Sequence, residues 1–176
     1  RQEVTAFVDT GNNVEIQLSD FNFKTGKVLF ANNGFASTLT GADVKPARAQ
    51  VLITEPIPGL RLKGTFHLDK GYYYFRNFED RILLGGGRNL DFAGETTTDF
   101  GHTDLIQNRL QQLLKEVILP DVDVKIAHRW SGIMGMGPQK NPIVRQLSNN
   151  VFCGVRLGGM GVAIGSLVGT EMANLV

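Results

Sequence analysis

The chain has 176 residues, of which 42% are hydrophobic, and a formal net charge of +1. This length can bury a sizeable core and makes one large domain or two small ones. Lys and Arg are scattered without a basic run, so the electrostatic footprint of a nucleic-acid-binding protein is missing. No apolar run approaches the roughly 20 residues needed to span a bilayer. We therefore expect neither a nucleic-acid partner nor a membrane span.

Cysteine and histidine usage points away from disulfides and metals. The single Cys153 cannot form an internal disulfide, and we expect a buried, inert thiol. His67, His102 and His128 are too scattered to predict a metal centre. The single cysteine fits a reducing compartment best. No signal peptide is visible, and we expect a cytoplasmic protein. The sequence opens at Arg1 and enters a strand pattern at once, so we expect a piece of a longer protein.

The first 40 residues predict a hairpin and a strand. Residues 4–8 and 14–18 alternate apolar and polar side chains around an Asn/Gly/Asp cluster, which indicates a β-hairpin with one solvated face. Residues 27–31 hold an unbroken Val-Leu-Phe core and lead into Asn-Asn-Gly. This pattern is typical of a strand buried on both faces. Residues 40–46 are interpreted as a linker.

The middle of the chain predicts a meander of short antiparallel strands rich in aromatic and aliphatic residues. These strands are expected at residues 48–54, 60–68, 71–76 and 81–85. Within the third, alternation places Tyr72 and Tyr74 on one face and Tyr73 on the other. The two phenols either pack at the water boundary or line a ligand cavity.

A helix and a last strand follow the meander. Residues 104–119 carry an apolar stripe that begins after a capping residue, Thr103 or Asp104, and stops at Pro120, so we expect a helix covering one face of the sheet. Residues 122–130 alternate again and predict a strand. Residues 131–142 are interpreted as an irregular loop.

The end of the chain, residues 151–163, reads VFCGVRLGGMGVA. An apolar strand leads into Gly158, Gly159 and Gly161, and a helix is expected at once over residues 162–176. Glycine accepts positive φ and lets backbone approach a ligand closely, while a helix N-terminus favours negative charge. The pattern alone predicts either a site for an anionic or electron-rich ligand or a tight turn that packs a helix on a strand.

A series of segments, taken in their order along the chain, resembles a known family, although no single motif among them would be specific enough. It comprises KVLFANNGFAS, RAQVLITEP, GYYYFRNFEDRILLGGG, an amphipathic helix ending in LP, HRWSGI, NPIV, NVF and LGGMGV. The series resembles the C-terminal half of the D-amino acid oxidase and glycine oxidase family of FAD-dependent oxidoreductases. That family opens with a GxGxxG turn that grips the FAD pyrophosphate, and this sequence contains no such segment.

The resemblance implies an α+β fold in three parts. Residues 1–40 would supply a hairpin and strand of the FAD domain, and residues 41–130 an antiparallel substrate-binding domain with its covering helix. Residues 131–176 would return to close an incomplete FAD-binding domain with the C-terminal helix. The expected partners are a small amine or amino-acid substrate and the N-terminal half of the same protein. Apolar surface that meets this half would promote self-association.

The resemblance also implies site residues, with FAD as the cofactor. Cofactor contacts would come from the end of the strand near residue 31 and from the terminal turn: Asn33, Gly34, Gly158, Gly159, Met160, Gly161 and Val162. Tyr72 matches a tyrosine that borders the substrate pocket, and Tyr74 is expected on the same face. Trp130 matches the aromatic residue just before the pocket loop. Hydride transfer from the substrate Cα–H to flavin N5 would give an imine, and no catalytic acid or base is identified.

The sequence departs from the family at the substrate carboxylate. Met134 occupies the position where the amino-acid oxidases use an arginine, and methionine cannot form a bidentate pair with a carboxylate. Either Arg76, Arg88 or Arg156 binds the carboxylate, or the substrate is not an α-amino acid. An alternative function remains, a non-catalytic antiparallel-sheet module that binds a ligand or a protein.

Overall fold

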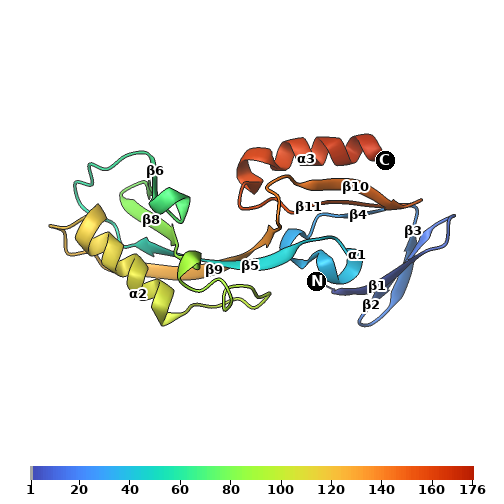
Figure 1. Ribbon diagram of the computed structural model, residues 1–176, viewed down its shortest axis with the longest axis horizontal. Helices are drawn as coiled ribbons and strands as arrows, with labels where there is room; N and C mark the ends of the chain where they lie inside the picture. The colour runs from blue at the N-terminus through green and yellow to red at the C-terminus, as the bar shows by residue number, and fades with distance from the viewer. Residues whose placement is uncertain (1) are drawn as a thin grey trace. The chain divides into compact units, whose positions relative to one another are not determined.

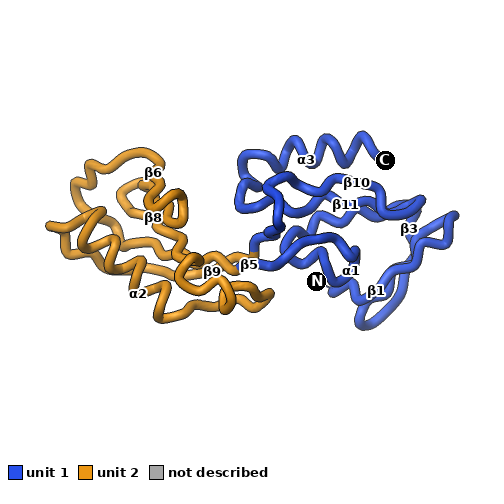
Figure 2. The backbone as a smooth tube through the Cα atoms, in the orientation of Figure 1, with its two compact units in different colours: residues 1–47, 134–176 blue, residues 48–133 orange. Residues whose placement is uncertain are grey.

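The chain sorts into two units, each with its own hydrophobic core. The computed structural model describes residues 2–176, so Arg1 lies outside the described residues. One unit combines residues 1–47 with 134–176, and the other contains residues 48–133 (Figure 2). The fold is a mixed α+β arrangement with antiparallel sheets and a C-terminal helix.

The first unit contains two three-stranded sheets (Figure 1). In one, β2 pairs antiparallel with both neighbours, and its alternation buries Val14, Ile16 and Leu18. In the other, β11 is central, antiparallel to β10 and parallel to β4. The strands of this unit are β1 (Val4–Asp9), β2 (Val14–Leu18), β3 (Asn22–Thr25), β4 (Val28–Phe30), β10 (Ile143–Ser148) and β11 (Val151–Val155).

Helical segments of the first unit flank β4 and β11. A 3-10 turn, η1 (Asn33–Phe35), and a short helix, α1 (Ser37–Thr40), follow β4. The C-terminal helix α3 (Gly161–Leu175) lies along β10 and β11, and buries Val168 and Met172. Gly154 of β11 makes this close packing possible, because a Cβ there would overlap the Sδ of Met172.

The second unit is built on a five-stranded sheet in the order β6-β7-β8-β5-β9. Its side chains share one core with helix α2 (Asp104–Leu113), which contributes Ile106 and Leu110 beside Leu52 and Leu84. The strands are β5 (Lys45–Thr54), β6 (Thr65–Leu68), β7 (Tyr73–Phe78), β8 (Arg81–Gly86) and β9 (Ile126–Met136), with 3-10 turns η2 (Asp69–Gly71) and η3 (Arg88–Leu90).

Several boundaries differ from the sequence predictions. The helix expected at 104–119 is α-helical only to Leu113 and continues as a π-helical turn, η4 (Leu114–Ile118). The strand expected at 122–130 begins later and runs through part of the predicted loop, because β9 extends to Met136. β4 was expected to be buried on both faces, which is wrong, since it lies at the edge of its sheet and leaves Leu29 45% exposed.

Two features are absent from residues 2–176. No helix there has the length and apolar character required to cross a membrane. The same residues hold no cluster of three or more His, Cys, Asp or Glu side chains able to coordinate a metal ion.

Candidate functional site

The turn between β11 and α3 has an unusual backbone. Arg156, Gly158 and Gly159 adopt left-handed φ values of 64°, 58° and 80°. Glycine accepts this conformation at little cost, whereas a left-handed residue with a side chain is strained by roughly 1–3 kcal/mol. Arg156 must therefore make contacts that offset the strain.

The side chain of Arg156 supplies those contacts from a position only 8% exposed. Its Nε donates to the carbonyl oxygen of Asn141 at 3.0 Å, and its Nη1 donates to the carbonyl oxygen of Asp43 at 3.3 Å. The Asp43 carboxylate lies 3.7 Å from the same Nη1. Gly137 leaves room for the side chain, because a Cβ there would overlap Arg156 Cδ. The predicted substrate residue Arg156 thus directs two of its nitrogens into its own chain.

A hydrogen bond to Asn33 connects the end of β4 to the turn between β11 and α3. Its Oδ1 accepts the backbone N–H of Leu157 at 3.0 Å, and its own φ is 45°. The N–H of Gly158 donates to the carbonyl oxygen of Gly135, in β9, at 3.0 Å. A Cβ on Gly135 would overlap Asn33 Oδ1. The end of β4, the end of β9 and the terminal turn therefore converge, with Gly34 buried behind them.

The N-terminus of α3 is open on this side. Gly159 and Met160 are exposed, and Val162 is fully exposed. Within residues 2–176 the structure records no partner for the N–H groups of Gly159, Gly161 and Val162. Unpaired N–H groups at a helix start carry partial positive charge and attract anions or electron-rich atoms.

Two further side chains belong to segments that meet at this corner. The Sδ of Met134 lies 3.4 Å from the position that a Cβ on Gly159 would occupy, so the structure brings these two predicted residues together. Asn32 donates from Nδ2 to the carbonyl oxygen of Phe35 at 3.1 Å, yet its Oδ1 is buried with no partner in the described part of the chain. The start of α3 thus offers unpaired donors, and the residue before Asn33 holds a buried, unpaired acceptor.

The tyrosines lie in the second unit and are not equivalent. Tyr72 caps η2 before β7 begins, so the prediction that it alternates with Tyr74 within one strand is wrong. Its ring is 42% exposed, whereas Tyr73 is buried. Tyr74 covers Gly85 of the adjacent strand, where a Cβ would lie 2.6 Å from its ring, and burial raises the pKa of its phenol.

Comparison with known proteins identifies the family. Residues 1–175 match the family described as FAD dependent oxidoreductase (DAO). The chain belongs to this family. Its cofactor is FAD, and the expected resemblance is confirmed.

One related protein and two solved structures extend the comparison. The probable oxidoreductase OrdL of Rhizobium meliloti strain 1021 is 28% identical over 174 residues, which cover 94% of this chain and 39% of that protein. Glycine oxidase from Geobacillus kaustophilus has a TM-score of 0.81 at 18% identity, over 99% of this chain and 47% of that chain. L-proline dehydrogenase from P. horikoshii has a TM-score of 0.79 at 21% identity, over 99% and 49%. The chain thus spans half or less of these proteins, and the structures establish the shared fold.

The residues at the glycine corner fit a flavin of the DAO family. Its ring system carries carbonyl oxygens that suit the unpaired N–H groups at the start of α3. The resemblance had already placed the Asn-Asn-Gly ending of the β4 segment, Asn32 included, near the cofactor. Sequence reasoning missed Gly135, because this residue was assigned to an irregular loop.

Proposed function

We propose that this chain forms the C-terminal part of an FAD-dependent oxidoreductase that oxidises an amine or amino acid by hydride transfer. The observation that supports it most is the open glycine corner, where left-handed Gly158 and Gly159 expose the first N–H groups of α3. If the chain itself covered this corner, these N–H groups would be inaccessible to a ligand. Membership of the FAD dependent oxidoreductase family identifies the cofactor as FAD.

The protein's part in this chemistry is placement and electrostatics. When bound, FAD supplies the two-electron acceptor of the reaction. The N-terminus of α3 stabilises negative charge at its unpaired N–H groups. Asn33 and Arg156 hold the turn in the conformation that presents these groups, and Met134 packs against Gly159 to close one side. Arg156 therefore acts here by positioning the turn, through its Nε and Nη1 donors to Asn141 and Asp43.

The test uses the full-length protein that contains this chain. Purified protein is expected to be yellow and to show a flavin absorbance spectrum. Val162→Asp places a negative charge beside the N-terminus of α3, where the fully exposed side chain leaves the fold unaffected. We expect this variant to bind FAD more weakly and to lower the reduction potential of the bound flavin, because like charges repel.

The control is Val162→Asn, which has the same shape as the aspartate variant but no charge, and should retain the wild-type potential within error. A colourless wild-type protein that gains no flavin spectrum on incubation with FAD contradicts the proposed function. An unchanged potential in Val162→Asp contradicts the placement of the flavin at this corner.

The chain alone is proposed to self-associate. Large apolar side chains of α3 remain exposed, including Val162, Leu167 and Leu175. Exposed apolar surface promotes association in water. Light scattering on residues 1–176 should give a mass above 19.3 kDa, and a monodisperse monomer at high concentration would refute this proposal.

A further inference from the structure

Three of the four methionines of the chain lie on segments that meet at the glycine corner. Met134 and Met136 belong to the end of β9 and are half-buried, whereas Met160 directly precedes α3 and is 56% exposed. The fourth, Met172, lies on the face of α3 that packs against β11 and is 5% exposed. A thioether is soft and polarizable, and oxidants convert it to a sulfoxide. Met160 is therefore the methionine that a small oxidant in solution reaches most easily.

Met160 is an unusual residue at a helix start. Helices usually begin at Ser, Thr, Asp or Asn, because the side-chain oxygen of these residues accepts an N–H of the first turn. The Met160 side chain makes no such bond, since a thioether is only a weak acceptor. Its backbone is fixed, because its N–H donates to the carbonyl oxygen of Leu157 at 2.8 Å and its carbonyl oxygen accepts the N–H of Ala163 at 2.9 Å. The N–H groups of Gly161 and Val162, next in sequence, have no partner among the described residues.

Oxidation by a peroxide would give this side chain the acceptor that it lacks. A lone pair of the Met160 sulfur attacks one oxygen of hydrogen peroxide, and the S–O bond forms as the O–O bond breaks. The departing hydroxide takes the proton from the transferred hydroxyl group and becomes water. Sulfur loses two electrons, and the peroxide gains them. The product is a polar sulfoxide, and the three rotatable bonds of the side chain let its oxygen turn toward the start of α3.

We infer that Met160 is a site of reversible oxidation that regulates the cofactor site, because its sulfoxide oxygen accepts the free N–H groups at the start of α3 and competes with the flavin for them. The inference rests on the proposed function, which places the flavin at this corner. Sulfoxide reductases convert methionine sulfoxide back to methionine, so the loss of cofactor affinity is reversible. The buried Met172 stays reduced, and the packing of α3 on β11 is therefore preserved.

The experiment treats the full-length protein with hydrogen peroxide, removes the excess with catalase and maps the oxidised methionines by peptide mass spectrometry. Met160 should be oxidised at peroxide concentrations that leave Met172 unmodified. Equilibrium dialysis then measures FAD affinity, which should fall by about 5- to 10-fold, as expected for the loss of one hydrogen bond. Methionine sulfoxide reductases for both sulfoxide epimers should restore the affinity. Weak FAD binding that persists after complete reduction overturns the inference.

Met160→Leu has a side chain of similar size without sulfur. Its FAD affinity is compared before and after peroxide, whatever the starting value, and should not change. Met172→Leu is the matched control, because it retains Met160 and should lose affinity on oxidation as the wild type does. Met134→Leu also retains Met160 and should respond in the same way. An unchanged FAD affinity in wild-type protein with fully oxidised Met160 overturns the inference while the proposed function stands, and so does protection by Met134→Leu.

Hydrogen exchange provides a second measurement that needs no flavin. In the oxidised protein the amides of Gly161 and Val162 should exchange with deuterium more slowly, because a hydrogen bond protects an amide from exchange. The same amides in peroxide-treated Met160→Leu should exchange as before treatment. Equal exchange rates before and after oxidation of Met160 overturn the inference by themselves. Untreated protein that binds no FAD overturns the proposed function instead, so the two failures are distinguishable.

Discussion

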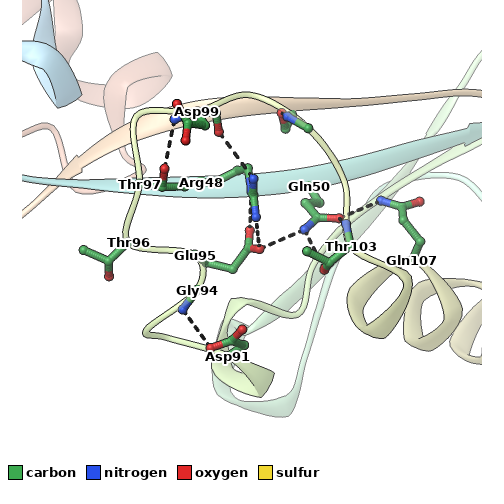
Figure 3. A network of polar contacts seen from close by, with 12 residues as sticks. Arg48, Gln50, Asp91, Gly94, Glu95, Thr96, Thr97, Asp99, Thr103 and Gln107 are labelled. Carbon is green, nitrogen blue, oxygen red and sulfur yellow. Dashed lines mark hydrogen bonds and ion pairs between the residues drawn. The ribbon is translucent and has the colours of Figure 1, made fainter.

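The buried pair of Arg48 and Glu95 makes the sharpest prediction for stability. The side chains are 12% and 0% exposed, and their closest nitrogen and oxygen atoms are 2.7 Å apart (Figure 3). Arg48→Met removes the cation, so the carboxylate of Glu95 keeps only the hydrogen bond from Gln50 Nε2. Leaving one charge of a buried pair uncompensated costs about 3–5 kcal/mol.

The cost can be measured as a free energy of unfolding in urea and as a shift in Tm. For a chain of this size each kcal/mol corresponds to about 2–4 °C, so Arg48→Met should lower Tm by roughly 6–20 °C. The double variant Arg48→Met with Glu95→Leu removes both charges and should regain most of this loss, because two apolar side chains need no partner.

The matched control is Lys24→Met, which breaks the exposed ion pair with Glu15 and should change the free energy by less than about 1 kcal/mol. The reasoning is refuted if Arg48→Met costs no more than this control. It is also refuted if the double variant is less stable than Arg48→Met, because the pair would then contribute more than its mutual compensation.

Three further predictions concern single positions. Hydrogen bonds from Ser148, Asn150 and the N–H of Gly11 lower the pKa of Asp9. The stability that the ionised Asp9 carboxylate contributes to the fold is therefore complete above the ordinary aspartate pKa and is lost as pH falls below about 4. Urea midpoints measured from pH 7 to pH 3 should thus decline less in Asp9→Asn than in the wild type. Gly154→Ala should cost about 1–3 kcal/mol through overlap with Met172, and Met172→Ala in the same chain should restore part of it in thermal melts. Gly135→Ala should displace the Asn33 side chain from Leu157, and a wild-type FAD affinity in this variant would contradict the role of that contact.

The periodicity of apolar residues correctly predicted those strands and helices whose structure depends on residues nearby in the sequence. The hairpin of β1 and β2 is confirmed, because residues 14–18 alternate strictly and bury every second side chain. The strand, turn and helix at the end of the chain are also confirmed, since apolar residues 151–155 precede glycines that only a turn would require. In both segments a few neighbouring residues determine the structure.

Elements that depend on distant partners were harder to predict. β10 was missed, although it pairs along its length with β11, because Arg145 and Gln146 interrupt its apolar pattern. β3 was missed for the same reason, since it carries polar side chains and is stabilised by pairing with β2. Hydrogen bonding to a strong neighbour can thus form a strand where side-chain pattern alone favours a loop.

The residues of the candidate site also differ in whether local sequence predicts them. The glycines of the terminal turn could be chosen from the sequence, because positive φ and close approach restrict those positions to glycine. The contact between Asn33 and Leu157 joins residues 124 positions apart, and no local pattern predicts it. Arg156 was expected to face a substrate, yet its position in a left-handed turn directs its guanidinium toward Asn141.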